Sequence, residues 1–183
     1  LEFRRVLFRS IHVAEQPLEV QQCLETRGTR PVRWLLDEVG LDARWCAVHA
    51  THLDDAETKD LAESGATLGL CPSTEANLGD GIFRGVDFLS AGGHFGVGSD
   101  SHVTVSATDE LRLFEYSQRL LRLQRNILAG DAPPANRHVG HRLWNLAAQG
   151  GAIALDQPIG LLEAGRRADF IVLDPNHPRL LGH

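Results

Sequence analysis

The feature that most constrains the fold of this chain is a regular alternation of short apolar segments with amphipathic ones. Strands are predicted at residues 11–14, 45–49, 67–71 and 95–99. The segments between them predict helices at residues 17–26, 31–39, 54–64, 83–91, 109–128 and 139–149. Strands that alternate with helices favour a parallel sheet with right-handed crossovers. A complete (β/α)8 barrel needs about 250 residues, so the four βα units predict an α/β fold that is the C-terminal half of a TIM-like barrel (strands 5–8).

Proline and glycine mark where several of these helices begin and end. Pro17 and Pro31 begin two of them. Proline suits this position because the N–H groups of the first helical turn have no partner within the helix, and proline has no N–H. Gly28, Gly40 and Gly65 follow the last turns, where a left-handed backbone suits glycine. We therefore expect residues 11–155 to form a single domain, since the chain is too short for two sizeable cores.

The pattern changes after Gly160. Residues 160–174 contain a turn, a tight glycine turn and an apolar run at 170–173 that predicts a strand. This segment has the character of a different kind of domain from the alternating part before it. We interpret residues 156–183 as part of a small β-sandwich domain.

The first ten residues also differ in character from the rest of the chain. They carry Arg4, Arg5 and Arg9 and no pattern that continues into Ile11, and the chain contains no methionine. A secretory signal would need a longer apolar stretch that arginines do not interrupt. We interpret residues 1–10 as a non-native cloning or assembly scar and expect the chain to be the C-terminal part of a longer protein.

Charge and cysteine content narrow the class of protein. The formal net charge is −6 and there is no basic stripe, which disfavours nucleic acid or an anionic membrane surface as a partner. No apolar run approaches the ~20 residues that a membrane span needs. Cys23, Cys46 and Cys71 are widely spaced and form no CxxC pair, which favours reduced, buried thiols in a cytoplasmic protein.

Residues suited to metal chemistry stand at three of the predicted strand ends. His12 and Glu15 lie at the end of the first strand, His49 ends the second, and Asp100 comes just after the fourth. The carboxyl ends of parallel strands form one face, where sites assemble from several strands. These four side chains can therefore converge despite their separation in sequence. Glu15 joins His12 only if the backbone turns after Ala14, because a straight strand would point the two to opposite faces.

Each of these residues also suits a structural role when taken alone. A histidine near a strand end is commonly a core residue, and an aspartate followed by serine commonly caps a helix or forms a turn. The polar stretch 71–81 predicts either a substrate-binding loop or a simple connection between strand and helix. It has no GK[ST] or GxGxxG pattern, which disfavours a phosphate-binding loop. Among the other histidines, His102 is retained as a supporting group near Asp100.

Three segments resemble the fifth-, sixth- and eighth-strand motifs of the amidohydrolase superfamily: His12-Val-Ala-Glu15, Val48-His-Ala-Thr-His52 and Gly98-Ser-Asp-Ser-His102. The resemblance extends over essentially everything after Ser10 and includes residues 69–81, 115–120 and 125–128. The run from Thr74 to Gly81 is the most discriminating, because related purine and cytosine-type deaminases differ there. It is similar to the deiminases of histidine degradation, which release ammonia from a formimidoyl group.

This resemblance implies a cytoplasmic, metal-dependent hydrolase that acts on a small molecule. His12 and Asp100 match metal-ligand positions, usually for zinc, and another divalent metal is the alternative. Glu15 and His49 match the proton-transfer and polarising positions, and Asp100 also matches the base that acts on the attacking water. The implied chemistry is hydrolytic deamination, in which His49 stabilises the tetrahedral centre and Glu15 passes a proton to the departing nitrogen. The resemblance is also compatible with a homodimer of the full-length protein.

The chain departs from the superfamily pattern in its metal ligands. The first-strand His-x-His pair has no counterpart, since no two histidines stand at that spacing. A catalytic zinc site normally has three or more protein ligands, so the chain alone is expected to bind metal poorly and to be inactive. Its exposed sheet edge should favour aggregation. Two alternatives remain open: a deaminase of the same superfamily for an aminated heterocycle, and a non-catalytic module that keeps a decayed barrel.

Overall fold

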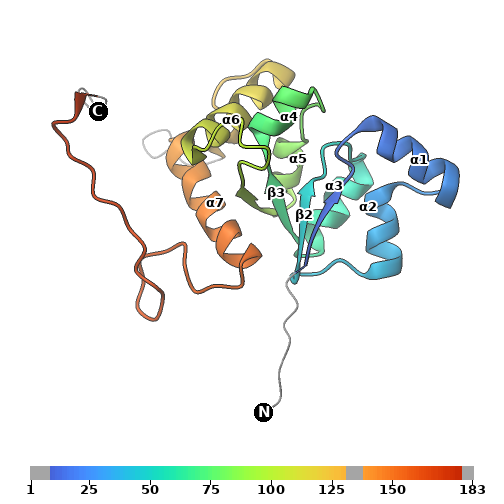
Figure 1. Ribbon diagram of the computed structural model, residues 1–183, viewed down its shortest axis with the longest axis horizontal. Helices are drawn as coiled ribbons and strands as arrows, with labels where there is room; N and C mark the ends of the chain where they lie inside the picture. Colours follow the sequence, from blue (N-terminus) through green and yellow to red (C-terminus); the bar gives the residue numbers. More distant parts are fainter. Residues whose placement is uncertain (1–8, 131–137, 179–183) are drawn as a thin grey trace, which may run out of the picture.

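The computed structural model describes residues 9–130 and 138–178 and contains one four-stranded parallel sheet within them (Figure 1). Its strands are β1 (Arg9–Val13), β2 (Trp45–His49), β3 (Thr67–Leu70) and β4 (His94–Val97). They lie in the order β1-β2-β3-β4, so each strand pairs with the next one along the chain. The predicted α/β class with a parallel sheet is therefore confirmed. Arg9 and Ser10 belong to β1, so the first strand begins two residues before the predicted start at residue 11.

Helices connect the strands and follow the last of them. They are α1 (Pro17–Arg27), α2 (Pro31–Trp34), the π-helical turn η1 (Leu35–Val39), α3 (Asp55–Glu63), α4 (Pro72–Leu78), α5 (Gly85–Ser90), α6 (Ala107–Arg122), the 3-10 turn η2 (Ile127–Ala129) and α7 (Val139–Ala154). Proline opens α1, α2 and α4, as expected at a first helical turn. Asp54 and Glu57 form a reciprocal capping box at the start of α3.

Several predicted boundaries are wrong, and α7, for example, ends at Ala154 rather than at residue 149. The sequence predicts a loop over residues 71–81, but α4 occupies most of that stretch and ends at Gly79, whose φ is 74°. It also predicts that the long helix reaches residue 128, but α6 ends at Arg122 because Leu123 adopts a left-handed φ of 54°. Leu123 is 91% exposed, so its apolar character does not mark a core-facing helical position.

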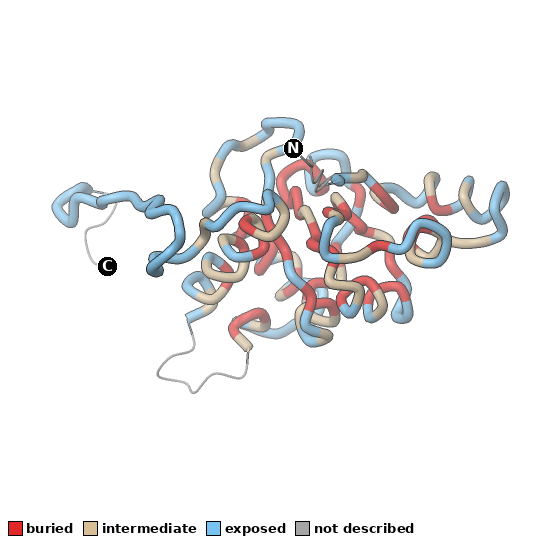
Figure 2. The backbone as a smooth tube through the Cα atoms, turned by 90° about the horizontal axis from the view of Figure 1, so that it is seen from below, coloured by how far each residue is buried: buried red, intermediate tan, exposed pale blue. Residues whose placement is uncertain are grey.

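The core lies along the sheet and beneath the helices that cover it (Figure 2). β3 is buried apart from the half-buried Gly69, as parallel strands covered on both faces are, whereas in β4 only Phe95 and Gly96 are buried. Helix α7 packs against β4 and β3 on the opposite side of the strands from α1 and α2 (Figure 1). The largest fully buried side chains include two aromatic rings and three leucines of these layers: Phe88, Phe95, Leu61, Leu68 and Leu70.

The segment after α7 has no regular structure among the residues described up to 178. From residue 161 on it is exposed and runs away from the sheet (Figures 1 and 2). The strand predicted at 170–173 is absent: Phe170 and Val172 are 69% and 85% exposed. Among the residues that the structure describes, the main chain here has no neighbouring strand to accept and donate hydrogen bonds. A single strand is not stable in water. No helix of the described residues is both long and apolar enough to cross a bilayer.

Candidate active site

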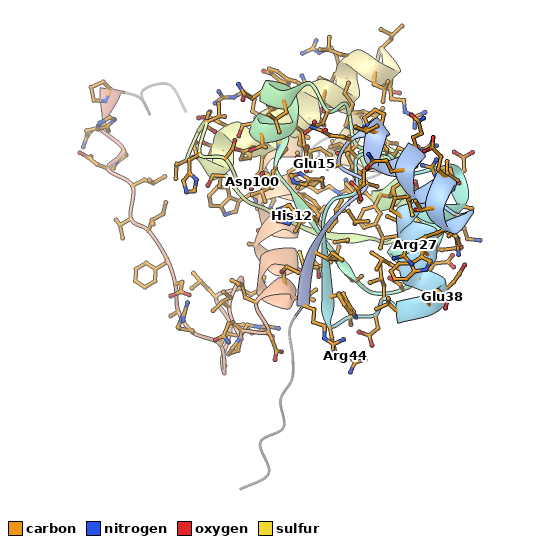
Figure 3. The ribbon with its side chains drawn as sticks, turned by 45° about the vertical axis from the view of Figure 1, so that its right-hand side comes forward. His12, Glu15, Arg27, Glu38, Arg44 and Asp100 are labelled. Atoms are coloured by element: carbon orange, nitrogen blue, oxygen red, sulfur yellow. The ribbon has the colours of Figure 1, made fainter. Side chains whose placement is uncertain are left out.

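The side chains singled out at the strand ends gather at the carboxyl end of the sheet. Figure 3 shows His12, Glu15 and Asp100 together at this end, whereas Arg44, which precedes β2, lies at the other. His12 belongs to β1, and its ring centroid lies 5.3 Å from that of His49, the last residue of β2. The geometry therefore brings together residues that are 88 positions apart in sequence, from His12 to Asp100.

Left-handed backbone bends turn these side chains toward one another. Ala14, His49 and Asp100 have φ values of 49°, 65° and 42°. Residues other than glycine rarely adopt such angles, and they cluster where surrounding structure enforces them, commonly at functional sites. The bend at Ala14 is the turn that Glu15 needs to share a site with His12. It ends β1 and redirects the next residue.

The carboxylate of Glu19, in the first turn of α1, holds the bend after β1. Its two oxygens accept hydrogen bonds from the N–H of Ala14 at 2.7 Å and of Glu15 at 2.9 Å. The main chain of the bend also contacts the segment after β2, because the N–H of His52 donates to the carbonyl of Ala14 at 3.0 Å. Both N–H groups that the bend exposes are thereby satisfied, which fixes the position of Glu15.

His49 occupies the centre of the cluster and is fully buried. Its Nε2 lies 3.5 Å from Glu15 Oε1 and 3.8 Å from Asp100 Oδ2, and its Nδ1 lies 3.2 Å from Glu75 Oε1. Nε2 is buried and has no hydrogen-bond partner within the described residues. A buried nitrogen without a hydrogen-bond partner lowers the stability of the fold. Nε2 of His49 faces two carboxylates at the carboxyl end of the sheet.

Carboxylates dominate the electrostatics around His49. Burial lowers the pKa of the imidazole, whereas the hydrogen bond with Glu75 and the negative charges of Glu15 and Asp100 raise it. The charges outweigh burial, and the pKa lies above its ordinary value. The ring is thus in a setting that stabilises positive charge, whether as a proton or as a bound cation.

Cys71 also lies close to His49 and Asp100. The nearest ligand atoms of these three residues are all within 4.8 Å of one another, an arrangement that could hold a metal ion. Burial and the neighbouring carboxylates of Glu75 and Asp100 raise the pKa of the Cys71 thiol to about 12. The thiolate is the form that binds metal, so Cys71 would have to lose this proton to act as a ligand.

The loop that carries Asp100 is anchored to α4 and α6. The Thr74 hydroxyl lies 2.9 Å from the Ser101 hydroxyl and accepts a hydrogen bond from the Ser101 N–H at 3.2 Å. Glu110 is buried and accepts hydrogen bonds from Thr104 in the loop and from the main chain of Ser73 in α4. His102 also has a left-handed φ, of 58°, and its main-chain N–H donates to the Ser99 carbonyl rather than to Asp100.

Sequence reasoning missed two acidic residues of the site, Glu19 and Glu75. Both lie in first turns of helices, at α1 and α4, and both accept hydrogen bonds from the main chain at the preceding strand end. The proline that opens each helix and the acidic residue two or three positions later form a start signal. At α4 this start signal begins with Pro72, and Gly79 marks the end of the helix.

The parallel sheet and the polar cluster at its carboxyl end now define the class of protein. The model of the amidohydrolase family matches residues 7–181, and the chain belongs to that family. Within it, the chain is 55% identical over 170 residues to formimidoylglutamate deiminase of Pseudomonas aeruginosa, a match that covers 93% of this chain and 37% of that protein. It is 32% identical to 5-methylthioadenosine/S-adenosylhomocysteine deaminase of Pelotomaculum thermopropionicum, covering 93% of this chain and 38% of that one.

Solved structures agree with these relatives. An amidohydrolase from Brucella melitensis matches with a TM-score of 0.85 and 47% identity, covering 95% of this chain and 38% of the other. A zinc-bound adenosine deaminase from Xanthomonas campestris matches with a TM-score of 0.81 and 25% identity, covering 95% and 39%. The chain therefore spans well under half the length of the proteins it resembles.

Proposed function

We propose that this chain is the C-terminal half of the catalytic barrel of a formimidoylglutamate deiminase of histidine degradation. Such an enzyme adds water to N-formimidoyl-L-glutamate and yields N-formyl-L-glutamate and ammonia. The observation that carries the proposal is the convergence of Glu15, His49 and Asp100, with Nε2 of His49 within 3.8 Å of both carboxylates. The 55% identity to the Pseudomonas deiminase supports the choice of substrate.

The residues present fit a divalent metal ion. Nitrogen and oxygen donors are typical zinc ligands. The buried Nε2 of His49, which has no hydrogen-bond partner among the described residues, lies 3.8 Å from Asp100 Oδ2. We propose His12 and Asp100 as ligands, with further ligands from parts of the whole protein outside this chain. When bound there, zinc would lower the pKa of a water molecule toward neutrality and so supply a nucleophile.

The other roles belong to side chains of this chain. Asp100 accepts the proton of the attacking water, and its loop holds it at the sheet edge. His49 stabilises the charge that develops as the formimidoyl carbon becomes tetrahedral, a role suited to a ring whose pKa is raised. Glu15 passes a proton to the departing nitrogen, which leaves as ammonia. Because the bend at Ala14 and the Glu19 carboxylate fix the Glu15 main chain, Glu15 is presented from a rigid support.

Ammonia release by the full-length protein that carries this sequence tests the proposal. We expect release from N-formimidoyl-L-glutamate in preference to S-adenosylhomocysteine and guanine. A chelator should stop the reaction and added zinc should restore it. Release from the heterocycles alone would favour the alternative deaminase, to which the 32% identity with the Pelotomaculum enzyme points. No release from any of these substrates would reject the proposal.

Variants separate an enzyme from a non-catalytic module. His49→Ala and Asp100→Asn should each lower turnover by about 100-fold or more, the scale of a general acid–base group. His94→Ala is the matched control, because His94 is exposed at the amino end of β4, away from the site. Unchanged turnover in both site variants would favour a module in which these residues have no chemical role.

A further inference from the structure

Glu75 makes a contact with His49 that the proposed reaction does not use. Glu75 lies in the first turn of α4, is 5% exposed, and places Oε1 3.2 Å from Nδ1 of His49. The same oxygen accepts a hydrogen bond from the Cys71 N–H at 3.0 Å. The carboxylate is therefore held between the start of its own helix and the imidazole ring of another strand end.

This contact constrains which ring nitrogen of His49 carries a proton. An ionised carboxylate is only an acceptor, so Nδ1 must donate to it. Nε2 is then the atom left for the site, and it is the buried nitrogen that has no partner among the described residues and faces Glu15 and Asp100. In protein sites the partner of one imidazole nitrogen commonly fixes the tautomer and orientation of the other.

We propose that Glu75 is a positioning residue for His49, which fixes the ring with Nδ1 protonated and Nε2 directed at the reacting atoms. What Nε2 does there rests on the proposed function, but the orientation of the ring does not. The competing explanation is that Glu75 serves only the start of α4 through its bond with Cys71. Glu110 offers a matched comparison, since it is another buried glutamate that bonds the main chain of α4, at Ser73, without touching His49.

The test is the protonation of the two His49 ring nitrogens in this chain. It uses histidine-selective ¹⁵N labelling and long-range ¹H–¹⁵N correlation, across a pH series that carries the ring from its charged to its neutral form. In the wild type the neutral ring should keep its proton on Nδ1. Glu75→Gln should retain this tautomer, because the amide oxygen still accepts, and Glu110→Gln should leave it unchanged. Glu75→Ala should shift the proton to Nε2.

Two results would overturn the proposal. One is a wild-type ring whose neutral form carries its proton on Nε2, a result that holds even if Glu75→Ala does not fold. The other is an equal change of the His49 tautomer in Glu110→Gln and in Glu75→Ala. That result would mean that the start of α4, and not Glu75 itself, controls the tautomer.

A kinetic measurement on the full-length protein extends the test to the reaction. Glu75→Ala should lower kcat by about 10- to 100-fold, the range typical of partners that orient a functional histidine, with a smaller change in KM. Glu75→Gln should recover most of this loss. Glu115→Gln, a buried glutamate of α6 that bonds Leu128 and Arg119, controls for loss of a buried charge. If the full-length protein releases no ammonia while the tautomer results hold, the proposed function fails and the positioning role stands.

Discussion

Gly150 of α7 lies directly against the main-chain carbonyl of Phe95 in β4. A side chain at Gly150 would overlap that carbonyl, whereas Gly151, the next residue, has no atom within 4 Å of the place where its Cβ would lie. On the strand side, a Cβ at Gly96 would come 3.2 Å from the Gly151 Cα. The helix and the strand thus meet through their backbones, and this contact sets how closely α7 covers the sheet.

We predict that Gly150→Ala destabilises the fold by about 3 kcal/mol, the upper part of the range typical of overpacking. The added methyl group can be accommodated only if α7 moves away from β4, which opens the core around Phe95 and Leu143. Urea unfolding followed by circular dichroism measures the loss in the free energy of unfolding.

Gly151→Ala is the control for this prediction. Its methyl group meets open space, and alanine favours a helix interior over glycine by up to about 1 kcal/mol. We expect its stability to equal or exceed that of the wild type. Equal destabilisation of both variants would show that the close approach of α7 to β4 does not determine the effect.

The Glu19 carboxylate provides a second prediction. Glu19→Ala removes the acceptor of two main-chain N–H groups, at Ala14 and Glu15, and should lower the free energy of unfolding by about 2 kcal/mol. In the full-length protein it should also lower turnover, because Glu15 loses its fixed position. Glu25→Ala is the control, since Glu25 is on the same helix and accepts one exposed hydrogen bond, from Gln21. A stability loss no larger than that of the control would contradict the prediction.

The three thiols should react with iodoacetamide at different rates. Cys23 is partly exposed, whereas Cys46 and Cys71 are buried. We expect native chain to be modified at Cys23 alone and urea-unfolded chain at all three, as mass spectrometry of tryptic peptides would show. Modification of Cys46 in the native chain at the rate of Cys23 would contradict the burial of β2.

Cys46 also predicts a loss of stability in alkali. Burial raises the pKa of its thiol above the reference value of 9.0, and a hydrogen bond with Ser10 offsets this only in part. Above pH 9.0 the unfolded chain loses this proton before the folded chain does, so the unfolded state is favoured as pH rises toward the folded pKa. Cys46→Ala should therefore show a shallower decline in unfolding free energy above pH 9.0 than the wild type. Equal declines in the unfolding free energy of the wild type and Cys46→Ala would contradict this prediction.

Zinc should bind weakly to the 183-residue chain by itself. His12 and Asp100 are the two proposed ligands in it, and catalytic zinc sites have three or more. Loss of one residue that hydrogen-bonds to a metal ligand lowers metal affinity by up to roughly 100-fold. We expect the zinc affinity of the chain alone to lie below that of the full-length protein by more than this factor. Calorimetric titration measures it. Asp100→Asn should weaken the residual binding and Cys71→Ser should not; tight binding, or dependence on Cys71, would contradict this ligand set.

Much of the fold could be predicted because the parallel sheet leaves a clear pattern in the sequence. The bounds of β2, residues 45–49, are those predicted, since an apolar run ends there at a histidine and a turn. The end of α6 could not be predicted from apolar spacing, because Leu123 and Asn126 adopt left-handed angles that their side chains do not require. The prediction of a strand at 170–173 was wrong for a different reason. A strand forms only with a partner strand, and its own residues do not reveal whether a partner is present.

The site could be predicted in part for a geometric reason. His12 and His49 lie in the last residues of their strands, Glu15 and Asp100 come just after theirs, and parallel strands bring their carboxyl ends to one edge. Glu75 could not be found in this way. It lies on a helix 26 residues beyond His49, and the hydrogen bond between them depends on how α4 packs against β2. No periodicity in the sequence connects the two.

The left-handed angle at Ala14 has a consequence for evolution and engineering. Glycine would adopt the same angle without steric penalty, and its greater freedom would let the chain leave that angle as easily as enter it. Alanine tolerates the bend only while Glu19 and the segment after β2 enforce it. Screens that select variants of the full-length protein for heat resistance alone are therefore expected to change positions such as this one, and to recover proteins of higher stability and lower turnover.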